Sequence, residues 1–329
     1  MNEQDILNRW ETEKQSYSDW GLFIAMQVEQ HLHPRIAPVA LNGFLKVPPS
    51  PRLKANNSLV DKALHRGKGY SDPYEEITDK VGLRYVVLLT SHIELLCEVI
   101  ESTACEPLWS YSKDRNFEDE RLARPLEFTY QSVHYVLRSK PGQAYEGRAL
   151  PEGLACEVQV RSLLQHAYSE LTHDTIYKPT VVAQASVHRT VARSMALIET
   201  TDDCFVRAMQ DLHAASEPQI RLLAALTEAY RRGTGLQPGQ ELSNQLIIDA
   251  LLPVLPAEPI AALDAFLARK RYVFDRVEMR YANSTFFQQP AVLLAYWMSS
   301  DYPRQIKERW PINPELLAAV FSDLGVAFS

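Results

Sequence analysis

The stretch Glu157-Val-Gln-Val-Arg-Ser-Leu-Leu-Gln-His-Ala-Tyr-Ser-Glu-Leu-Thr-His-Asp174 decides the fold. Its first five residues alternate between polar and apolar, which predicts a β-strand whose polar side chains share one face. These polar residues are Glu157, Gln159 and Arg161. The rest has helical spacing, with His166 and Glu170 four residues apart. The polar face suits a charged ligand, and a solvated amphipathic edge strand is the alternative.

Composition places the 329-residue chain among globular proteins, since 46% of its residues are hydrophobic and 23% are charged. The net charge of −7 argues against broad nucleic-acid binding, which needs a basic face, but it leaves room for a local nucleotide pocket. The N-terminus has no signal-peptide pattern, and no run approaches the roughly 18 apolar residues of a membrane span. The four cysteines lack metal-binding spacing and are expected to be small buried residues in a reducing compartment. Together these features lead us to expect a cytoplasmic protein without a membrane partner.

Hydrophobic periodicity predicts a mixed α/β region followed by an all-helical one. Strands are expected at 83–89, 108–111, 133–138 and 155–161, and helices at 4–32, 57–66, 92–103 (capped by Ser91), 162–174 and 184–212. Further helices are expected at 218–232, 243–252, 259–270, 288–299 and 314–323, the last beginning at Asn313-Pro314. We therefore predict a first domain of residues 1–214 and a helical domain of residues 215–329, with the boundary near 214–217.

A basic cluster lies at the start of the second predicted helix, in the order Arg52, Lys54, Ser58 and Lys62. Ser58 and Lys62 are four residues apart and share a helix face, while Arg52 and Lys54 alternate on the extended segment before it. Three cations and a hydroxyl near a helix N-terminus suit a triphosphate. A solvated basic turn is the alternative.

Two further clusters lie on predicted strands. Asp79, Gly82 and Arg84 stand at the start of the first buried strand, where a carboxylate can bind Mg²⁺ together with phosphate oxygens; a capping aspartate is the alternative. Tyr130, Ser132 and His134 share one face of a later strand, where the ring suits base stacking; an aromatic ladder between strands is the alternative. If the strands of Asp79 and Glu157 are neighbours, the two acids form a metal-binding pair.

The order of these motifs resembles the synthetase domain of the RelA/SpoT alarmone synthetases, over about residues 15–210. The resemblance includes Gln165-His166-Ala167, His173 and Tyr177-Lys178 after the strand of Glu157. The chain has no upstream histidine–aspartate hydrolase motif, so it is similar to a small, stand-alone member with a helical C-terminal extension. The resemblance implies a mixed five-stranded, nucleotidyltransferase-like sheet flanked by helices.

The resemblance also implies an activity and its residues. Members transfer the β,γ-pyrophosphate of ATP to a ribose 3′-hydroxyl, usually of GDP or GTP, which gives (p)ppGpp. The residues implied to bind ATP are Arg52, Lys54, Ser58, Lys62 and Arg84. Asp79 would bind Mg²⁺, and Glu157 would join the metal site or act as general base. The residues implied to bind the acceptor are Tyr130, Ser132, His134, Gln159, Arg161 and His166.

The approach to Tyr130 departs from the family pattern. Many members have a lysine and an Asn-Gly pair here, whereas this chain has Leu126, Phe128 and Thr129 at those positions, and Glu127 would repel acceptor phosphates. The cations that would compensate are Lys113, Arg115, Arg121 and Arg124. The acceptor therefore stays open between GDP or GTP, an adenine nucleotide and the 3′ end of tRNA.

Two alternatives to an alarmone synthetase remain at this point. One is a toxic member that modifies tRNA and is paired with an antitoxin; the other is a non-catalytic nucleotide-binding regulator. Residues 215–329 would act as an oligomerisation or capping extension, or as a regulatory module over the active site. The aromatic residues between Tyr272 and Trp310 would form either a docking surface or a helical core.

Overall fold

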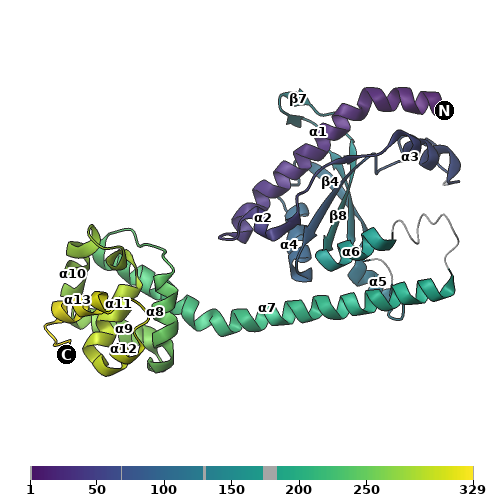
Figure 1. Cartoon of the computed structure of the whole chain (residues 1–329). Helices are drawn as coiled ribbons and strands as arrows, with labels where there is room; N and C mark the ends of the chain where they lie inside the picture. Colours follow the sequence, from purple (N-terminus) through teal and green to yellow (C-terminus); the bar gives the residue numbers. More distant parts are fainter. Residues whose placement is uncertain (1, 68, 129–130, 173–183, 329) are drawn as a thin grey trace. The chain divides into compact units, whose positions relative to one another are not determined.

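The computed structural model describes residues 2–67, 69–128, 131–172 and 184–328 (Figure 1). The chain forms two compact units, Met1–Ala208 and Met209–Ser329. The predicted domain boundary at residues 214–217 stays a prediction. Within the described ranges no single helix is long and apolar enough to cross a membrane, and one bent pair, Ser243–Val254 with Pro259–Arg269, passes by length and composition alone.

The first unit is built on a mixed sheet, as predicted. Among the described residues it has six strands, in the order β1-β3-β8-β5-β4 with β2 beside β3. Their bounds are Leu45–Val47 (β1), Arg52–Leu53 (β2), Val81–Val87 (β3), Trp109–Arg115 (β4), Val133–Ser139 (β5) and Ala155–Ser162 (β8). Strands β3 and β8 run parallel, and the other pairs are antiparallel. A separate hairpin pairs Ala144–Tyr145 (β6) with Arg148–Ala149 (β7).

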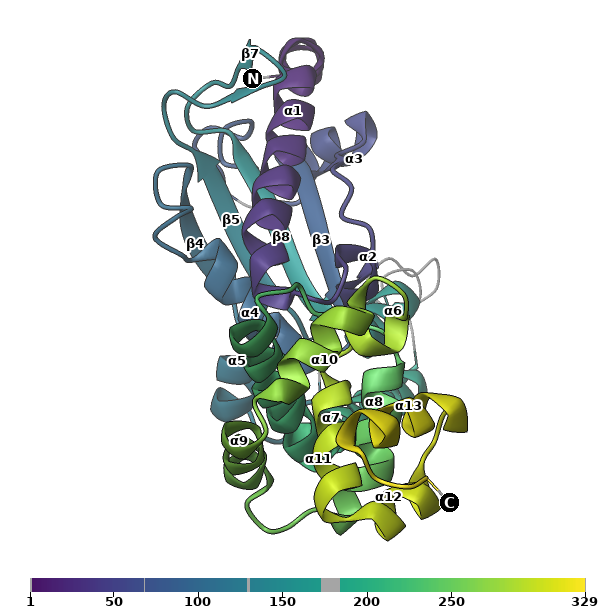
Figure 2. The same ribbon diagram turned by 90° about the vertical axis from the view of Figure 1, so that its left-hand side faces the viewer.

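Helices cover one face of this sheet. The first unit contains α1 (Glu3–Ile36), α2 (Leu41–Phe44), α3 (Asn56–Val60), the π-helix η1 (Asp61–His65), α4 (Thr90–Ile100), α5 (Phe117–Ala123) and α6 (Leu163–Thr172). Helix α1 crosses β5, β8 and β3, as Figure 2 shows, and with α4 it contacts β3 and β8. The apolar residues that alternate along the strands, such as Tyr85, Val158 and Tyr135, are buried in this core. The polar residues between them therefore lie on the opposite face.

Three local predictions need correction. Ser91 does not cap α4, because that helix already begins at Thr90, with Leu89 at the N-cap. The predicted helix 57–66 is an α-helical turn followed by a π-helix, and the extra residue per turn rotates Lys62 relative to Ser58. Cys105 and Cys156 are buried as expected, but Cys97 is only half-buried and Cys204 is exposed.

A glycine lets α1 approach the segment that carries the basic cluster. A Cβ atom built on Gly21 would lie 2.7 Å from Pro51 Cβ and 3.1 Å from Val81 Cγ2. We expect Gly21→Ala to lower the free energy of unfolding by up to about 2 kcal/mol, because overpacking costs about 1–3 kcal/mol against a gain of about 1 kcal/mol in helix propensity. Urea denaturation measures this change.

Gly43 offers the matched control for this substitution. It is also helical, but its added Cβ would meet only Val39 Cγ1, at 3.7 Å. Gly43→Ala should therefore leave the stability unchanged or raise it slightly. Equal effects of the two substitutions would show that α1 does not need the close approach at Gly21.

The two helices predicted at 184–212 and 218–232 form one helix, α7 (Ala185–Thr234), with Pro218 inside it. A proline removes one backbone hydrogen bond, yet alanine, leucine, glutamine and arginine on both sides favour the helix. The gap predicted between residues 212 and 218 was therefore wrong.

The second unit is all-helical, as predicted. Beyond α7 its elements are α8 (Ser243–Leu251), η3 (Leu252–Val254), α9 (Pro259–Arg269), α10 (Tyr272–Tyr281), η4 (Thr285–Gln288), α11 (Ala291–Asp301), α12 (Pro303–Arg309) and α13 (Pro314–Leu324). Helix α11 is buried over nearly its whole length and contacts α8, α9, α10, α12 and α13. Asn313 caps α13 by accepting a hydrogen bond from the Glu315 amide, as its sequence predicts. Phe286, Phe287, Tyr296 and Trp297 are buried, so they form a helical core.

Candidate active site

Strand register places the polar side chains of three strands side by side. Arg84 of β3 and His134 of β5 both stand opposite Gln159 of β8. One row further along, Gly82 and Val136 flank Glu157. Because these residues alternate with core residues, their side chains share the face of the sheet that α1 and α4 leave uncovered.

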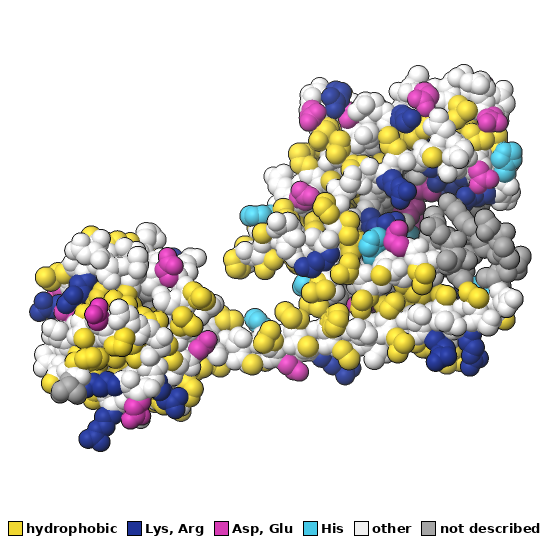
Figure 3. All heavy atoms as spheres, in the orientation of Figure 1, with side chains coloured by type: hydrophobic (Ala, Val, Ile, Leu, Met, Phe, Trp, Pro, Cys, Tyr) yellow, Lys and Arg dark blue, Asp and Glu magenta, His cyan; other side chains and the backbone are white. Residues whose placement is uncertain are grey.

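A cavity of about 680 Å³ opens on this face. Its lining includes seven residues predicted from the sequence: Arg52, Lys54, Ser58, Asp79, Arg84, Glu157 and Gln159. Ser50 and Arg66 also line it, and the sequence did not single them out. In Figure 3, basic and acidic side chains gather between α3 and α6 on the face shown. The structure thus brings the cation cluster, both acids and the polar strand face together.

Asp79 lies between two lysines of the basic cluster. Its Oδ2 accepts a hydrogen bond from Lys54 Nζ at 2.7 Å, and its Oδ1 lies 3.0 Å from Lys62 Nζ. Burial alone would raise the pKa of Asp79, but the hydrogen bonds and charges of Lys54 and Lys62 lower it below its ordinary value. The carboxylate is therefore ionised at neutral pH.

Glu157 has different neighbours. Gln159 Nε2 donates to Glu157 Oε1 at 2.6 Å, and His134 Nδ1 lies 3.4 Å from the same oxygen. Burial and the charge of Asp79 act to raise the pKa of Glu157, yet the hydrogen bonds from His134 and Gln159 bring it below the ordinary value. Glu157 is thus an ionised, half-buried carboxylate whose orientation is fixed by two neighbours.

The two acids fit one kind of metal site. No group of three or more His, Cys, Asp or Glu is arranged to hold a metal ion in the described part of the chain, which argues against a closed protein cage. Mg²⁺ needs less, because one or two carboxylates plus phosphate oxygens suffice. Asp79 Oδ1 is buried and lies 3.0 Å from Lys62 Nζ, and a carboxylate oxygen has a further lone pair that can face a cation. Asp79 and Glu157 therefore fit Mg²⁺ bound together with a nucleotide.

Helix α6 contributes a residue that was not predicted as a site residue. Glu170 Oε1 accepts a hydrogen bond from Arg84 Nη1 at 2.8 Å, and it lies 3.8 Å from His166 Nδ1. Burial and the nearby charges of Arg161 and Arg84 lower the pKa of His166, so its ring is neutral at pH 7. The spacing of four between His166 and Glu170 was the sequence signal for this contact.

The residues predicted to bind the acceptor do not all reach the cavity. Arg161 and Ser132 are fully buried beneath it, and Arg161 donates a hydrogen bond to Gln159 Oε1. Arg161 therefore acts on the cavity through Gln159, and the polar face of β8 continues into the protein interior. Tyr130, His173, Tyr177 and Lys178 lie outside the described residues.

A second cavity, of about 520 Å³, contains three of the four compensating cations. Arg115 donates to Glu120 at 2.5 and 2.8 Å, Arg121 donates to Gln131 at 2.8 Å, and Arg124 lies 3.4 Å from Glu127. Lys113 is not among its lining residues and pairs with Glu101 instead. Helix α5, which forms much of this cavity, was not predicted, although Asn116 before three acidic residues is a helix-start signal.

Comparison with known proteins identifies the class of this unit. Residues 51–181 match the family model for the region found in RelA / SpoT proteins. This match confirms, over residues 51–181, the resemblance to the RelA/SpoT proteins stated from the motifs. No curated protein sequence matches the chain.

Solved structures of other chains are also similar to part of this chain. Small alarmone synthetase 1 from Bacillus subtilis is 16% identical over 63% of this chain and 99% of its own, with a TM-score of 0.49. The structure of the same protein bound to its product pppGpp is 18% identical over 63% of this chain and 99% of its own, with a TM-score of 0.48. A GTP pyrophosphokinase family protein from Streptococcus pneumoniae gives 16% identity over 63% of this chain and 94% of its own, with a TM-score of 0.48.

Proposed function

We propose that the first unit is a pyrophosphokinase that transfers the β,γ-pyrophosphate of ATP to the ribose 3′-hydroxyl of a nucleotide. GDP or GTP is the favoured acceptor, which gives (p)ppGpp. The proposal is carried by one observation, that Asp79 and Glu157 line the same cavity as Arg52, Lys54, Ser58 and Arg84. The RelA/SpoT match of residues 51–181 supports it.

The proposed roles follow from charge and position. Arg52, Lys54, Lys62 and Arg84 bind the ATP triphosphate, with Ser58 donating from the start of α3. Asp79 is a ligand for Mg²⁺, which when bound neutralises phosphate charge. Glu157 is the general base or a second ligand. Because phosphoryl chemistry needs mainly positioning and charge neutralisation, these groups are sufficient for it.

The proposed reaction balances without a further reactant. The acceptor 3′-oxygen attacks the β-phosphorus of ATP, and the bond from that phosphorus to the α,β-bridging oxygen breaks. AMP leaves with the bridging oxygen, and the hydroxyl proton passes to Glu157. Gln159 and His134 hold the Glu157 carboxylate, so they orient the base.

A transfer assay tests this function. The chain is incubated with γ-labelled ATP, Mg²⁺ and, separately, GDP, GTP, AMP or purified tRNA, and the products are identified by mass spectrometry. We expect a labelled GDP or GTP derivative carrying a 3′-pyrophosphate, together with AMP. Nucleotide binding without transfer to any acceptor would instead support the non-catalytic regulator.

The second cavity bears on the alternative acceptors. Asp119, Glu120 and Glu127 line it together with the three arginines, so its charges balance and a polyphosphate gains little there. Leu122 and Leu126 beside it are 83% and 92% exposed. An acceptor held by apolar contacts with its base rather than by its phosphates, such as the 3′ end of tRNA or an adenine nucleotide, fits these surroundings. Labelled tRNA and growth arrest that Asp79→Ala reverses would identify the toxic activity.

The remaining partners stay predictions. We expect homo-oligomerisation, an antitoxin partner and a cytoplasmic location, and the geometry of the cavity bears on none of the three. Size-exclusion chromatography with light scattering measures the first of these.

A further inference from the structure

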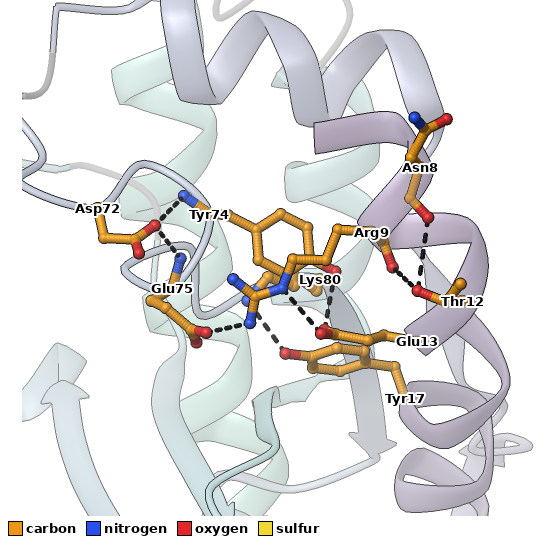
Figure 4. Close-up of polar contacts among 9 residues, drawn as sticks. All are labelled: Asn8, Arg9, Thr12, Glu13, Tyr17, Asp72, Tyr74, Glu75 and Lys80. Atoms are coloured by element: carbon orange, nitrogen blue, oxygen red, sulfur yellow. Dashed lines mark hydrogen bonds and ion pairs between the residues drawn. The ribbon is translucent and has the colours of Figure 1, made fainter. Parts of the chain in front are cut away.

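A buried lysine lies directly beside the proposed metal ligand. Lys80 follows Asp79 in the chain and is 1% exposed. Its Nζ donates to the Tyr17 hydroxyl at 3.0 Å and lies 4.4 Å from the centre of the Tyr74 ring. Figure 4 shows Lys80 between these two tyrosines. Burial lowers the pKa of Lys80 to about 8, although Glu75 and Glu13 act to raise it.

The lysine and its two tyrosines join α1 to the segment that leads into β3. Tyr74 donates to Glu13 Oε2 at 3.0 Å, and Arg9 donates to Glu13 Oε1 at 2.8 Å while lying 4.2 Å above the Tyr74 ring. Arg9 also pairs with Glu75. The charges of this group balance, and most of its contacts connect residues about 60 positions apart (Figure 4). The group therefore fixes where residues 74–80 lie on α1.

The opposite side of the same segment belongs to the cavity. While the Lys80 side chain contacts α1, the Asp79 carboxylate contacts Lys54 and Lys62. The Lys80 carbonyl also accepts a hydrogen bond from the Lys54 amide at 2.9 Å, which continues the ladder between β2 and β3. Lys80 thus contacts α1 through its side chain and the Lys54 backbone through its carbonyl, next to the Asp79–Lys54 ion pair.

Packing alone does not explain why residue 80 is a lysine. An apolar side chain of similar length would fill the space between two rings without the cost of removing an ammonium from water. A charged hydrogen bond differs from apolar contact because it has a direction. In some proteins a buried polar contact of this kind fixes one conformation among several.

We propose that Lys80 is a positioning residue for Asp79. Its ammonium, held between Tyr17 and Tyr74, fixes the bend before β3 and so directs the Asp79 carboxylate toward Lys54, Lys62 and the Mg²⁺ of a bound nucleotide. The proposal rests on the proposed function of this cavity. Lys80 itself touches neither nucleotide nor metal.

Binding of a non-hydrolysable ATP analogue at a series of Mg²⁺ concentrations tests this role, with calorimetry as the readout. Lys80→Met should raise the Mg²⁺ concentration for half-maximal binding about tenfold or more, the usual effect of removing a support behind a metal ligand. Binding without Mg²⁺ should stay within about twofold, since the phosphate-binding cations are intact. The Tm should change little, because the cost of burying the ammonium and its hydrogen bond to Tyr17 disappear together.

Two further variants keep this test decisive. Tyr17→Phe removes only the hydroxyl that accepts from Lys80, so it should shift the Mg²⁺ dependence in the same direction by a smaller factor even if Lys80→Met folds poorly. Lys14→Met makes the same chemical change on α1, at a lysine that pairs only loosely with Glu11, at 3.3 Å, and it should change nothing.

The outcomes separate this proposal from the function of the cavity. Wild-type Mg²⁺ dependence in both Lys80→Met and Tyr17→Phe would overturn the positioning role. So would a loss of Mg²⁺-free and Mg²⁺-dependent binding in parallel with a fall in Tm, which indicates a structural role only. If the wild type binds the analogue with Mg²⁺ yet transfers nothing, only the proposed reaction fails. If it binds no analogue, both proposals fail.

Discussion

Glu157→Gln should lower the kcat of pyrophosphoryl transfer by about 10³-fold, within the range measured for loss of a general base. The substitution keeps the volume of the side chain and its contact with Gln159, which can turn its amide to suit the new one. It removes the charge that accepts the proton of the 3′-hydroxyl. Steady-state kinetics with ATP and the acceptor found in the transfer assay measure the change.

The effect should fall on kcat more than on the affinity for ATP. Among the described residues, the contacts of Glu157 are with Gln159 and His134 rather than with the basic cluster, so the triphosphate keeps its cations. We expect the dissociation constant of the ATP analogue to change by less than about fivefold, as for an interaction made mainly in the transition state.

A surface glutamate provides the control. Glu146 lies in the turn between β6 and β7, where it pairs with Arg148 at 3.4 Å, and Glu146→Gln should leave both constants unchanged. Unchanged kcat in Glu157→Gln would exclude Glu157 as the base. Equal losses in kcat and in analogue affinity would make it a metal ligand instead.

The pH dependence of kcat provides a second reading of the same group. The hydrogen bonds from His134 and Gln159 bring the pKa of Glu157 below 4.5 despite its burial. The base is therefore ionised above that value and is lost only as the pH falls through it. The wild-type kcat should not decline between pH 8 and about pH 6 through protonation of this residue.

The polar face of β8 could be read directly from the sequence, and its surroundings could not. Strict alternation from Glu157 to Arg161 fixes which side chains share a face. It does not show that Gly82 pairs with Glu157, since these residues are 75 positions apart and the register depends on hydrogen bonds between strands. The meeting of Asp79 and Glu157 in one cavity was therefore a condition of the hypothesis, and the structure meets it.

Local signals failed where tertiary contacts or neighbouring propensities decide. Pro218 predicts a break in a helix, yet strong helix formers on both sides carry α7 through it. Arginine and lysine usually lie at the protein surface, and nothing in the adjacent sequence shows that Arg161 and Lys80 are buried. Burial of a charged side chain depends on the tertiary structure around it, as with Tyr17, the hydrogen-bond partner of Lys80, which lies 63 positions away in the chain.

Asp79→Asn should have two opposite effects on nucleotide binding, which makes it the sharpest test of the metal site. Without Mg²⁺ the Asp79 carboxylate competes with phosphate for Lys54 and Lys62, since it contacts both. Its neutralisation should strengthen Mg²⁺-free binding of the ATP analogue by about threefold to tenfold, from the loss of one nearby like charge. With Mg²⁺ this gain from the substitution should be cancelled, because the variant has lost a carboxylate ligand for the metal.

Transfer should fall by about 10²–10³-fold in this variant, the usual cost of removing one electrostatic stabiliser from an active site. Calorimetry with and without Mg²⁺, together with steady-state kinetics, measures both effects. Equal weakening of binding in the two conditions would contradict the assignment of Asp79 as a metal ligand. Ser58→Ala provides the contrast, since it removes a proposed phosphate donor without changing the charge, and it should weaken both kinds of binding.

The stability of Asp79→Asn follows from the direction of the same pKa. Because Lys54 and Lys62 lower the pKa of Asp79 below 3.8, its ion pairs stabilise the fold above that value and lose this effect as the pH falls through the folded-state pKa. At pH 7 we expect the free energy of unfolding of the variant to be about 1–2 kcal/mol below that of the wild type. Partial solvent exposure of the three groups keeps this difference small. The difference should shrink toward zero in acid. A difference that persists at low pH would mean that Asp79 stabilises the unit by packing rather than through its ion pairs with Lys54 and Lys62.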